Sequence, residues 1–256
     1  MTDHDSAADA ARIRLAGPAD IRGWSSGEVE NPKTIDPTTG RPVPGGLHCE
    51  RIFGPVGDRE RVRGRRAGHI ELSAPVVHTW FVGRTNLLGT LLGLRRSHLQ
   101  KVVYGQCHVV TDPGTSPLAR GQLLTDEEHD QARATYGDAF RAGTGAAAVR
   151  ELLLTLDLAK LSADLRAQLI TRVKRAKPGS PQVRRLTERV KLVEELRDSG
   201  NRPEWLVLDC IPVIPPALRR GANRRADGDL DELYARVINR SQRLRKLADL
   251  NAPEVV

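Results

Sequence analysis

The sequence predicts an α+β fold that contains more helix than strand. Two long segments, residues 146–177 and 183–198, have the apolar spacing of amphipathic helices and flank a Pro-Gly-Ser-Pro turn. Residues 229–250 repeat that spacing near the C-terminus. Two short apolar stretches, residues 102–111 and 205–211, are typical of strands. A chain of 256 residues can form one large domain or two of ordinary size.

The N-terminal quarter of the chain is expected to lack long elements. Residues 1–18 are rich in Ala, Asp and Arg without periodicity, which predicts a flexible tail. Within the next region, residues 19–67, Gly and Pro recur between positions 21 and 55 and exclude long helices. Residues 56–67 are cationic and contain no cysteine, and we expect a loop there.

Residues 68–218 are expected to form the main body of the fold. Residues 69–72 alternate between polar and apolar, and residues 75–81 are β-branched and aromatic. Residues 87–99 are leucine-rich and predict a helix. Residues 102–111 follow as a strand that an Asp-Pro-Gly turn closes.

Helix-capping signals define the next segments. Thr125 and Glu128 have the capping-box spacing, and Gly137 ends the helix that they begin. An antiparallel helical hairpin is then expected over residues 146–199. Gly200 follows its second helix in the position typical of a helix end.

The C-terminal region, residues 219–256, is expected to begin as a loop and continue as a basic amphipathic helix. Prolines at 212, 215 and 216 stop the strand at 205–211. The helix over residues 229–250 has an apolar stripe with arginines expected on the opposite face. The stripe consists of Leu230, Leu233, Val237, Leu244 and Leu247.

Arginine dominates the charge of the chain. The formal net charge is +8, from 40 Lys and Arg against 32 Asp and Glu. Guanidinium groups bind phosphate in a bidentate manner, so a polyanionic partner explains this excess. A genome whose base composition favours arginine codons explains it equally well, and composition leaves both explanations open.

Cysteine usage and the N-terminus indicate the compartment. Cys49, Cys107 and Cys210 lie far apart and form neither a disulfide set nor a CxxC pair, which suits a reducing environment. The start of the chain is acidic, and no long uncharged apolar run follows. We therefore expect a cytoplasmic protein without a membrane partner.

No pattern predicts a catalytic centre. The acidic run at residues 227–231 has a spacing that could bind Mg²⁺, but the glycine and glutamate of a calcium loop are absent at positions 232 and 238. Acidic residues are also favoured at a helix N-terminus, which is the simpler interpretation. The seven histidines form no metal-binding or catalytic pair. We expect no catalytic residue, no metal ligand and no cofactor in this chain.

Specific strings of residues identify a family. In order along the chain these are IRGWSSGEV at 21–29, PKTI at 32–35, GLHCERIFGP at 46–55, GHIEL at 68–72, VVTDPG at 109–114, GQLLT at 121–125, YGDAF at 136–140, SGNRPEW at 199–205, PVIPP at 212–216 and RVINR at 236–240. Together they resemble the N-terminal region of the bacterial RNA polymerase beta-prime subunit. The resemblance runs from about residue 21 to the end of the chain.

The resemblance implies a clamp. In that family this stretch forms part of a mobile wall that closes over DNA and carries a helical docking site for the sigma factor. It therefore implies DNA, other RNA polymerase subunits and sigma factor as partners. The DNA-binding side chains would come from loops that resemble the family's zipper and lid, namely Arg41, Arg219, Arg220, Arg224 and Arg225. The sigma-docking side chains would come from one face of the last helix, namely Arg236, Asn239, Arg240 and Arg243.

This sequence also departs from the family. A four-cysteine zinc ribbon is usual between Pro55 and Gly68, and no cysteine occurs there. The lid-like segment near residues 219–228 is shortened. The family's catalytic magnesium motif lies beyond the stretch that this chain resembles, and the returning helix of the docking hairpin is expected to be missing.

Two classes of function follow from the resemblance. The first is the N-terminal clamp part of the beta-prime subunit, which contributes DNA holding and sigma docking rather than nucleotidyl transfer. The second is a stand-alone paralogue that binds DNA, sigma factor or polymerase as a regulator or decoy, or else a non-functional fragment.

Overall fold

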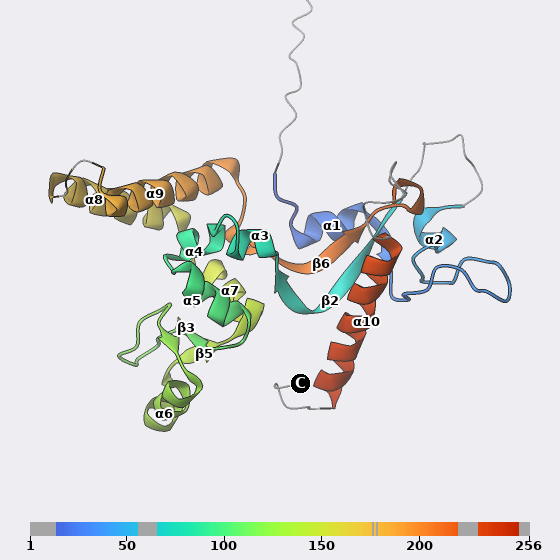
Figure 1. The fold of residues 1–256 in the computed structure, drawn as a ribbon, viewed down its shortest axis with the longest axis horizontal. Coiled ribbons are helices and arrows are strands. Elements are labelled where there is room, and N and C mark those ends of the chain that lie inside the picture. Colours follow the sequence, from blue (N-terminus) through green and yellow to red (C-terminus); the bar gives the residue numbers. More distant parts are fainter. Residues whose placement is uncertain (1–13, 56–65, 176, 178, 220–229, 251–256) are drawn as a thin grey trace, which may run out of the picture.

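The computed structural model describes residues 14–55, 66–175, 177, 179–219 and 230–250. Helices predominate, and two small sheets lie in separate parts of the molecule (Figure 1). The α+β class that the sequence predicts is confirmed. The first sheet lies beside the N- and C-terminal elements, and a helical hairpin projects from the opposite end.

The first sheet contains three strands in the order β1-β2-β6. Strand β1 (Ser25–Glu28) runs parallel to β2 (Ala67–Val77), and β6 (Val207–Val213) runs antiparallel to β2 on its other side. The register pairs Gly68 with Val213 and Val77 with Val207. This register shifts between Glu71 and Val76. The sequence predicted two separate stretches, 69–72 and 75–81. In the structure, residues 69–77 belong to one irregular strand, β2.

The strand expected at 205–211 is displaced towards the C-terminus. Pro203–Leu206 forms the short helix η2, and β6 continues through Pro212 to Val213. A second short helix, η3 (Pro216–Leu218), follows the strand. The predicted strand break therefore comes after Val213 rather than at Pro212.

The N-terminal elements pack on this sheet. Helix α1 (Pro18–Trp24) begins where Asp20 accepts a hydrogen bond from the Gly17 N–H at 2.9 Å, and helix α2 (Glu50–Phe53) follows a long loop. Their shared core with the strands and the last helix consists of Val29, Leu47, Cys49, Ile52, Phe53, Ile70, Val213 and Ile238. Residues far apart in sequence therefore build one core at this end.

The larger core is helical. It is built by α3 (Thr79–Val82), α4 (Leu87–Leu92), α5 (Arg96–Val103), α7 (Gly145–Leu154), α8 (Leu158–Arg175) and α9 (Pro181–Ser199). Helices α8 and α9 form the predicted antiparallel hairpin (Figure 1).

Two expected helices are each divided in the structure. The helix expected over 146–177 is interrupted before α8, where the Asp157 carboxylate accepts hydrogen bonds from the N–H groups of Ala159 and Lys160 at 2.9 and 3.0 Å. This is the local geometry of a helix start, so a new helix begins there. The helix expected over 87–99 ends at Gly93, whose φ of 74° favours glycine, and α5 begins three residues later.

The second sheet has the order β4-β3-β5, with β3 (His108–Asp112), β4 (Leu123–Leu124) and β5 (Arg141–Gly143) all antiparallel. The strand expected over 102–111 begins only at His108, because the preceding residues complete α5. Helix α6 (Asp126–Tyr136) packs beside this sheet, and the short helix η1 (Gly137–Ala139) follows it. Its predicted capping box between Thr125 and Glu128 is confirmed.

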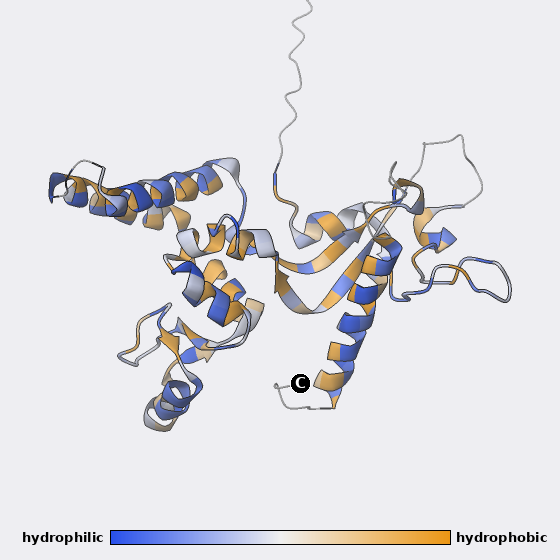
Figure 2. Ribbon diagram, viewed as in Figure 1, coloured by the Kyte–Doolittle hydropathy of each residue, from blue (hydrophilic) through white to orange (hydrophobic). Residues whose placement is uncertain are grey.

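Helix α10 (Leu230–Asp249) lies across the first sheet, against β2. Its predicted extent is confirmed to within a residue at each end. Figure 2 shows that much of its surface is hydrophilic, as is the outer end of the α8–α9 hairpin. Both elements therefore combine an apolar contact face with a polar surface.

An ion-pair network fastens α1 to the first sheet. Arg22 donates from Nε to Glu71 Oε1 at 2.6 Å and from Nη2 to Glu71 Oε2 at 2.8 Å. These hydrogen bonds hold the pKa of Glu71 below its usual value, against the opposing effect of burial. His69 Nε2 lies 3.2 Å from the same carboxylate.

Replacing Glu71 tests the contribution of this network. Because the folded-state pKa of Glu71 is lowered, its charge stabilises the fold above its unfolded pKa, and this contribution disappears as the pH falls through the folded value. We expect Glu71→Gln to lower the free energy of unfolding by about 1 kcal/mol at pH 7, since the pair is partly exposed. Urea unfolding at several pH values measures the difference, which should vanish in acid.

The matched control is Glu195→Gln. Glu195 forms only a helix-surface pair with Lys191 at 3.7 Å. Its replacement should cost no more than about 0.5 kcal/mol. A pH-independent loss in Glu71→Gln would show that the ion pair is not the cause.

Candidate nucleic-acid and protein-docking surfaces

Arg219 is the centre of the junction between α10 and the rest of the molecule. Its side chain is only 2 % exposed, and Nη1 lies 2.6 Å from Asp231 Oδ1. Nε donates to the carbonyl of Ile214 at 2.7 Å. The guanidinium also lies 4.9 Å from the ring centre of Phe53 and 5.4 Å from that of Tyr234. Such a group is held by directed hydrogen bonds and by cation–π attraction.

Arg219 is one of the residues expected to contact DNA, and in this structure its side chain is buried. A phosphate could reach the guanidinium only if the contacts with Asp231 and the two rings were lost. The expectation assumed a solvated loop, because sequence alone does not reveal that aromatic rings enclose this arginine. Arg219 is a structural residue in this fold.

The Asp231 carboxylate contacts both His48 and Arg219. His48 Nε2 lies 2.9 Å from Oδ2, whereas Arg219 occupies Oδ1. Asp231 belongs to the acidic run that the sequence analysis assigned to a helix N-terminus, and it does lie in the first turn of α10. It also forms specific side-chain contacts that the capping interpretation did not include.

The remaining predicted DNA-binding arginines lie elsewhere. Arg41 is exposed in a loop that the bridges Asn31–Gly46 and Ile35–Pro42 narrow into a hairpin-like shape. Ile35, which pairs with Pro42 across this loop, is 47 % exposed. Arg220, Arg224 and Arg225 lie outside the described residues. Of the five predicted DNA-binding arginines, the structure therefore describes only Arg41 and Arg219.

The four predicted sigma-docking residues share the exposed side of α10. Arg236, Asn239, Arg240 and Arg243 are all exposed, and Arg236 pairs with Glu232 one turn earlier. The helix contacts the sheet through Ile238, which is 2 % exposed, and through Ser241, whose hydroxyl and carbonyl bond to Ser73.

The expected separation of a leucine stripe from an opposing arginine face is wrong. Leu233 and Leu244 are 47 % and 44 % exposed. Arg240 lies between them on the helix, because it follows Leu233 by seven residues and precedes Leu244 by four. The packed side is offset to Tyr234, Ile238 and Ser241, so α10 presents a surface that is both cationic and apolar.

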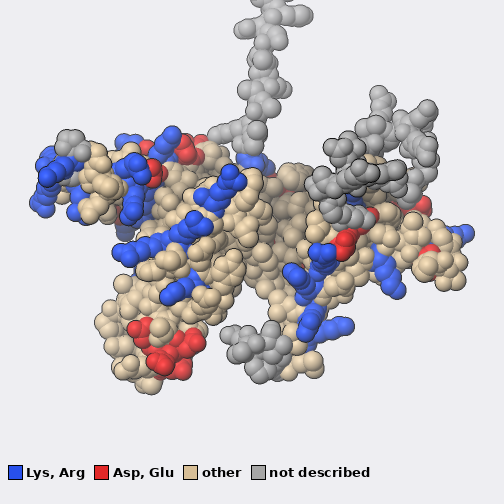
Figure 3. Space-filling model, viewed as in Figure 1, with Lys and Arg blue, Asp and Glu red and all other residues tan. Residues whose placement is uncertain are grey.

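A basic groove at the tip of the α8–α9 hairpin was missed by the sequence analysis. Its volume is about 740 Å³, and its charged lining consists of Arg172, Arg175, Arg185 and Arg189 with no carboxylate among the lining residues. Figure 3 shows the basic side chains gathered at this free end of the hairpin. The sequence signal was present, since basic residues end one helix and begin the next, but it becomes a site only when the turn brings the helices together.

Arg189 anchors the groove to the body. Its Nη2 donates to the carbonyl of Leu91 at 3.1 Å, and burial lowers its pKa. A Cβ at Gly93 would lie 2.7 Å from Arg189 Nη1, so glycine permits this close approach. Arg172, Arg175 and Arg185 are exposed. They have no ion-pair partner among the described residues.

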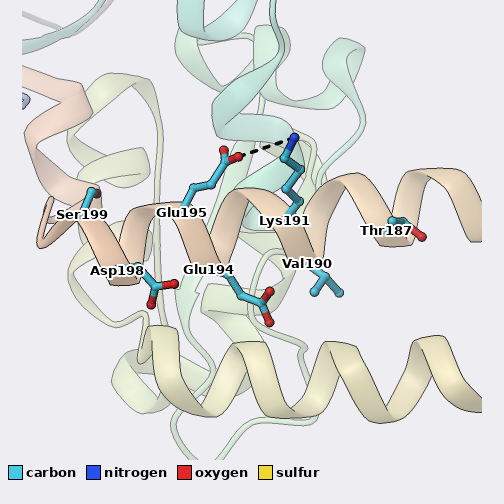
Figure 4. A pocket seen from close by; sticks show the side chains of 7 residues that line it. All are labelled: Thr187, Val190, Lys191, Glu194, Glu195, Asp198 and Ser199. Carbon is cyan, nitrogen blue, oxygen red and sulfur yellow. Dashed lines mark ion pairs between the residues drawn. The ribbon is translucent and has the colours of Figure 1, made fainter. Parts of the chain in front are cut away.

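The opposite end of α9 has acidic character. Figure 4 shows a groove there that contains Glu194, Glu195 and Asp198 beside Lys191. Glu194 is already bound by Arg166 and by the Ser162 hydroxyl at 3.0 Å, and the Arg166 bond lowers its pKa. The hairpin therefore carries carboxylates, several of them bonded to neighbouring side chains, where it joins the body of the molecule. Its free tip carries arginines.

No described residues form a metal centre. Groups of three or more His, Cys, Asp or Glu side chains in a metal-binding arrangement do not occur in the part of the chain that the structure describes. Cys49, Cys107 and Cys210 are buried free thiols, and burial raises the pKa of Cys210 to about 11. The segment where the family's zinc ribbon would lie, residues 56–65, is outside the described residues. None of the described helices is both long and apolar enough to cross a membrane.

Comparison with known proteins identifies the family. The family described as RNA polymerase Rpb1, domain 1, matches residues 7–256. The chain belongs to this family. The resemblance inferred from the sequence strings is thereby confirmed.

Curated relatives of the Rpb1 domain 1 chain include DNA-directed RNA polymerase subunits beta'. The protein of Rhodopirellula baltica is 49 % identical over 96 % of this chain and 19 % of its own length. Those of Moorella thermoacetica and Thermoanaerobacter pseudethanolicus are 45 % and 44 % identical, over 96 % and 97 % of this chain and 23 % of each relative. The chain thus spans about a fifth of the length of these relatives.

Truncation of Arg219 should destabilise this Rpb1 domain 1 chain strongly. Arg219→Ala removes the buried guanidinium that bonds to Asp231 and lies against two aromatic rings. We expect the free energy of unfolding to fall by about 3 kcal/mol. Chemical denaturation measures this loss. The exposed Arg243→Ala is the control and should change stability by less than about 0.5 kcal/mol. Equal effects of the two variants would contradict the structural role of Arg219.

We also expect the purified chain to carry no stoichiometric zinc. A structural zinc site needs about four thiolate or imidazole ligands, and the cysteine quartet is missing from the sequence. Elemental analysis after dialysis without chelator provides the measurement. One equivalent of retained zinc would show that other ligands replace the quartet.

Proposed function

We propose that this chain is the N-terminal clamp part of the DNA-directed RNA polymerase beta-prime subunit. It would act in DNA-templated transcription by holding DNA and docking sigma factor, with catalysis supplied elsewhere in the enzyme. The names of the curated relatives support transcription as the process. Other polymerase subunits are then expected partners.

The proposal is supported mainly by two separate surfaces that expose arginine side chains. One is the hairpin groove with Arg172, Arg175 and Arg185, and the other is the α10 surface around Arg240. The two surfaces differ in chemistry. The groove gathers four arginines with no carboxylate among its lining residues, whereas exposed leucines, Leu233 and Leu244, lie among the arginines of α10.

The groove suits a phosphodiester backbone. Four guanidinium groups line it and none of its lining residues is a carboxylate, so incoming phosphates would displace counterions. Such contacts bind DNA without reading its sequence. We therefore assign DNA holding to the hairpin tip, and Arg41 remains a second DNA contact by resemblance to the zipper.

The α10 surface suits a protein partner. Arginines interspersed with exposed leucines favour an amphipathic partner that presents both carboxylates and apolar side chains. Sigma factor is the partner that the family resemblance implies. The docking residues proposed are Arg236, Asn239, Arg240 and Arg243.

Removing the groove arginines should weaken DNA binding. We expect the triple variant Arg172→Ser, Arg175→Ser, Arg185→Ser to bind a fluorescent 20-base-pair duplex about tenfold more weakly at low salt. The slope of log affinity against log salt concentration should decrease in magnitude by about 2 to 3, because each lost phosphate contact contributes about 0.9 to that slope. Fluorescence anisotropy at several salt concentrations measures both quantities.

The control removes three arginines that already have acidic partners. Arg120 and Arg141 lie 3.8 and 3.4 Å from Asp112, and Arg133 lies 2.7 Å from Asp138. Their triple serine variant has the same net charge as the groove variant. If both variants lose affinity equally, net charge rather than the groove explains the binding.

Charge reversal on α10 tests sigma docking. We expect Arg240→Glu to weaken binding of the sigma factor about tenfold, because a carboxylate would face the partner's acidic groups. Arg245→Glu makes the same change on another side of α10 and should have little effect. Biolayer interferometry with purified sigma factor gives the two dissociation constants. If Arg240→Glu binds as tightly as the unmodified chain, the docking assignment is wrong.

A further inference from the structure

Helix α10 is fastened near its beginning by a cluster drawn from three parts of the chain. Asp231 lies in its first turn, Arg219 follows η3, and His48 precedes α2. Arg219 and His48 contact different oxygens of the same carboxylate, at 2.6 and 2.9 Å. A carboxylate held on both oxygens has little rotational freedom, so the cluster restrains direction as well as position.

Aromatic packing adds a second restraint at the same place. Tyr234, one turn after Asp231, lies against the Arg219 guanidinium and donates from its hydroxyl to the Pro212 carbonyl at 3.3 Å. Phe53 lies on the guanidinium as well. The first turn of α10 is therefore tied to β6 and α2 simultaneously.

Further along α10, residues 241 and 242 also attach the helix to the N-terminal part of the molecule. Ser241 bonds to Ser73, and Gln242 Nε2 donates to the Glu30 carbonyl at 2.6 Å. Beyond them, Arg243, Leu244 and Lys246 are exposed. The distance from Asp231 to Arg243 along the helix axis is about 18 Å, so a swing of about 10° at the base moves Arg243 by about 3 Å.

We propose that Asp231 is a positioning residue that sets the direction of α10, with Arg219 and His48 as its two anchors. The three residues act as a joint between the N-terminal region, the sheet and the helix. This role differs from simple stabilisation of the fold. When the joint is lost, the chain remains folded, but the exposed arginines of α10 lie in a different place.

The consequence for docking rests on the proposed function. If α10 binds sigma factor through Arg240, a displaced helix presents that side chain in the wrong place. The geometric claim itself does not depend on any partner. A distance measurement on the isolated chain therefore separates failure of the joint from failure of the docking assignment.

The test measures the distance between α10 and β2 by double electron–electron resonance. Spin labels are attached at Val76→Cys in β2 and Lys246→Cys in α10, both exposed positions. The three native cysteines are buried, which favours labelling of the introduced ones. The otherwise unmodified chain should give one narrow distance distribution.

Three substitutions give distinct expectations. Asp231→Ala should shift or broaden the distribution by up to about 4 Å, because residue 246 lies about 22 Å along the helix axis from Asp231 and a swing of about 10° moves it that far. Asp231→Asn keeps an acceptor for Arg219 and a polar group for His48, so it should restore most of the narrow distribution. Asp249→Ala removes an exposed aspartate at the far end of the same helix and should leave the distribution unchanged.

A folded Asp231→Ala variant with an unchanged distribution would overturn the proposal. Far-UV circular dichroism establishes that the variant is folded. If it is not, His48→Ala removes only one of the two anchors and provides the decisive measurement. A distribution in His48→Ala that matches the unmodified chain would then refute the joint, whereas a broader one would support it.

Discussion

A guanidinium enclosed by protein holds the C-terminal helix of this chain against the rest. Removing Arg219 from water would be costly if it were unpaired, since a buried charge loses its hydration. The structure offsets that cost with the Asp231 carboxylate, the Ile214 carbonyl and the faces of Phe53 and Tyr234. The position of α10, and with it the display of its exposed arginines, depends on this arrangement.

The arginines that the structure describes are used in physically different ways. Buried or half-buried ones, such as Arg219 and Arg189, join elements that are distant in sequence, and each bonds to a main-chain carbonyl. Some exposed ones, such as Arg236, have an acidic partner, whereas those of the hairpin groove have none among the lining residues. Net charge does not distinguish these uses, which is why composition alone left the nature of the partner open.

The sequence predicted elements well wherever local chemistry decides them. The capping box of Thr125 and Glu128 and the apolar repeat within α9 act over a few residues, and both were correctly located. The start of α8 at Asp157 was missed, because leucines on both sides continue a helical pattern across the break. The burial of Arg219 and the convergence of arginines at the hairpin tip depend on tertiary contacts, and neither was predicted. The family could be identified from the sequence because the match involves many short motifs in the same order along the chain and does not depend on any one tertiary contact.

We propose that this chain works as part of a transcription enzyme. The most direct measurement is affinity purification of a tagged chain from the cells that encode it, after nuclease treatment, with the retained proteins identified by mass spectrometry. We expect other RNA polymerase subunits and sigma factor to be retained in comparable amounts. Recovery of the chain without any polymerase subunit would contradict it.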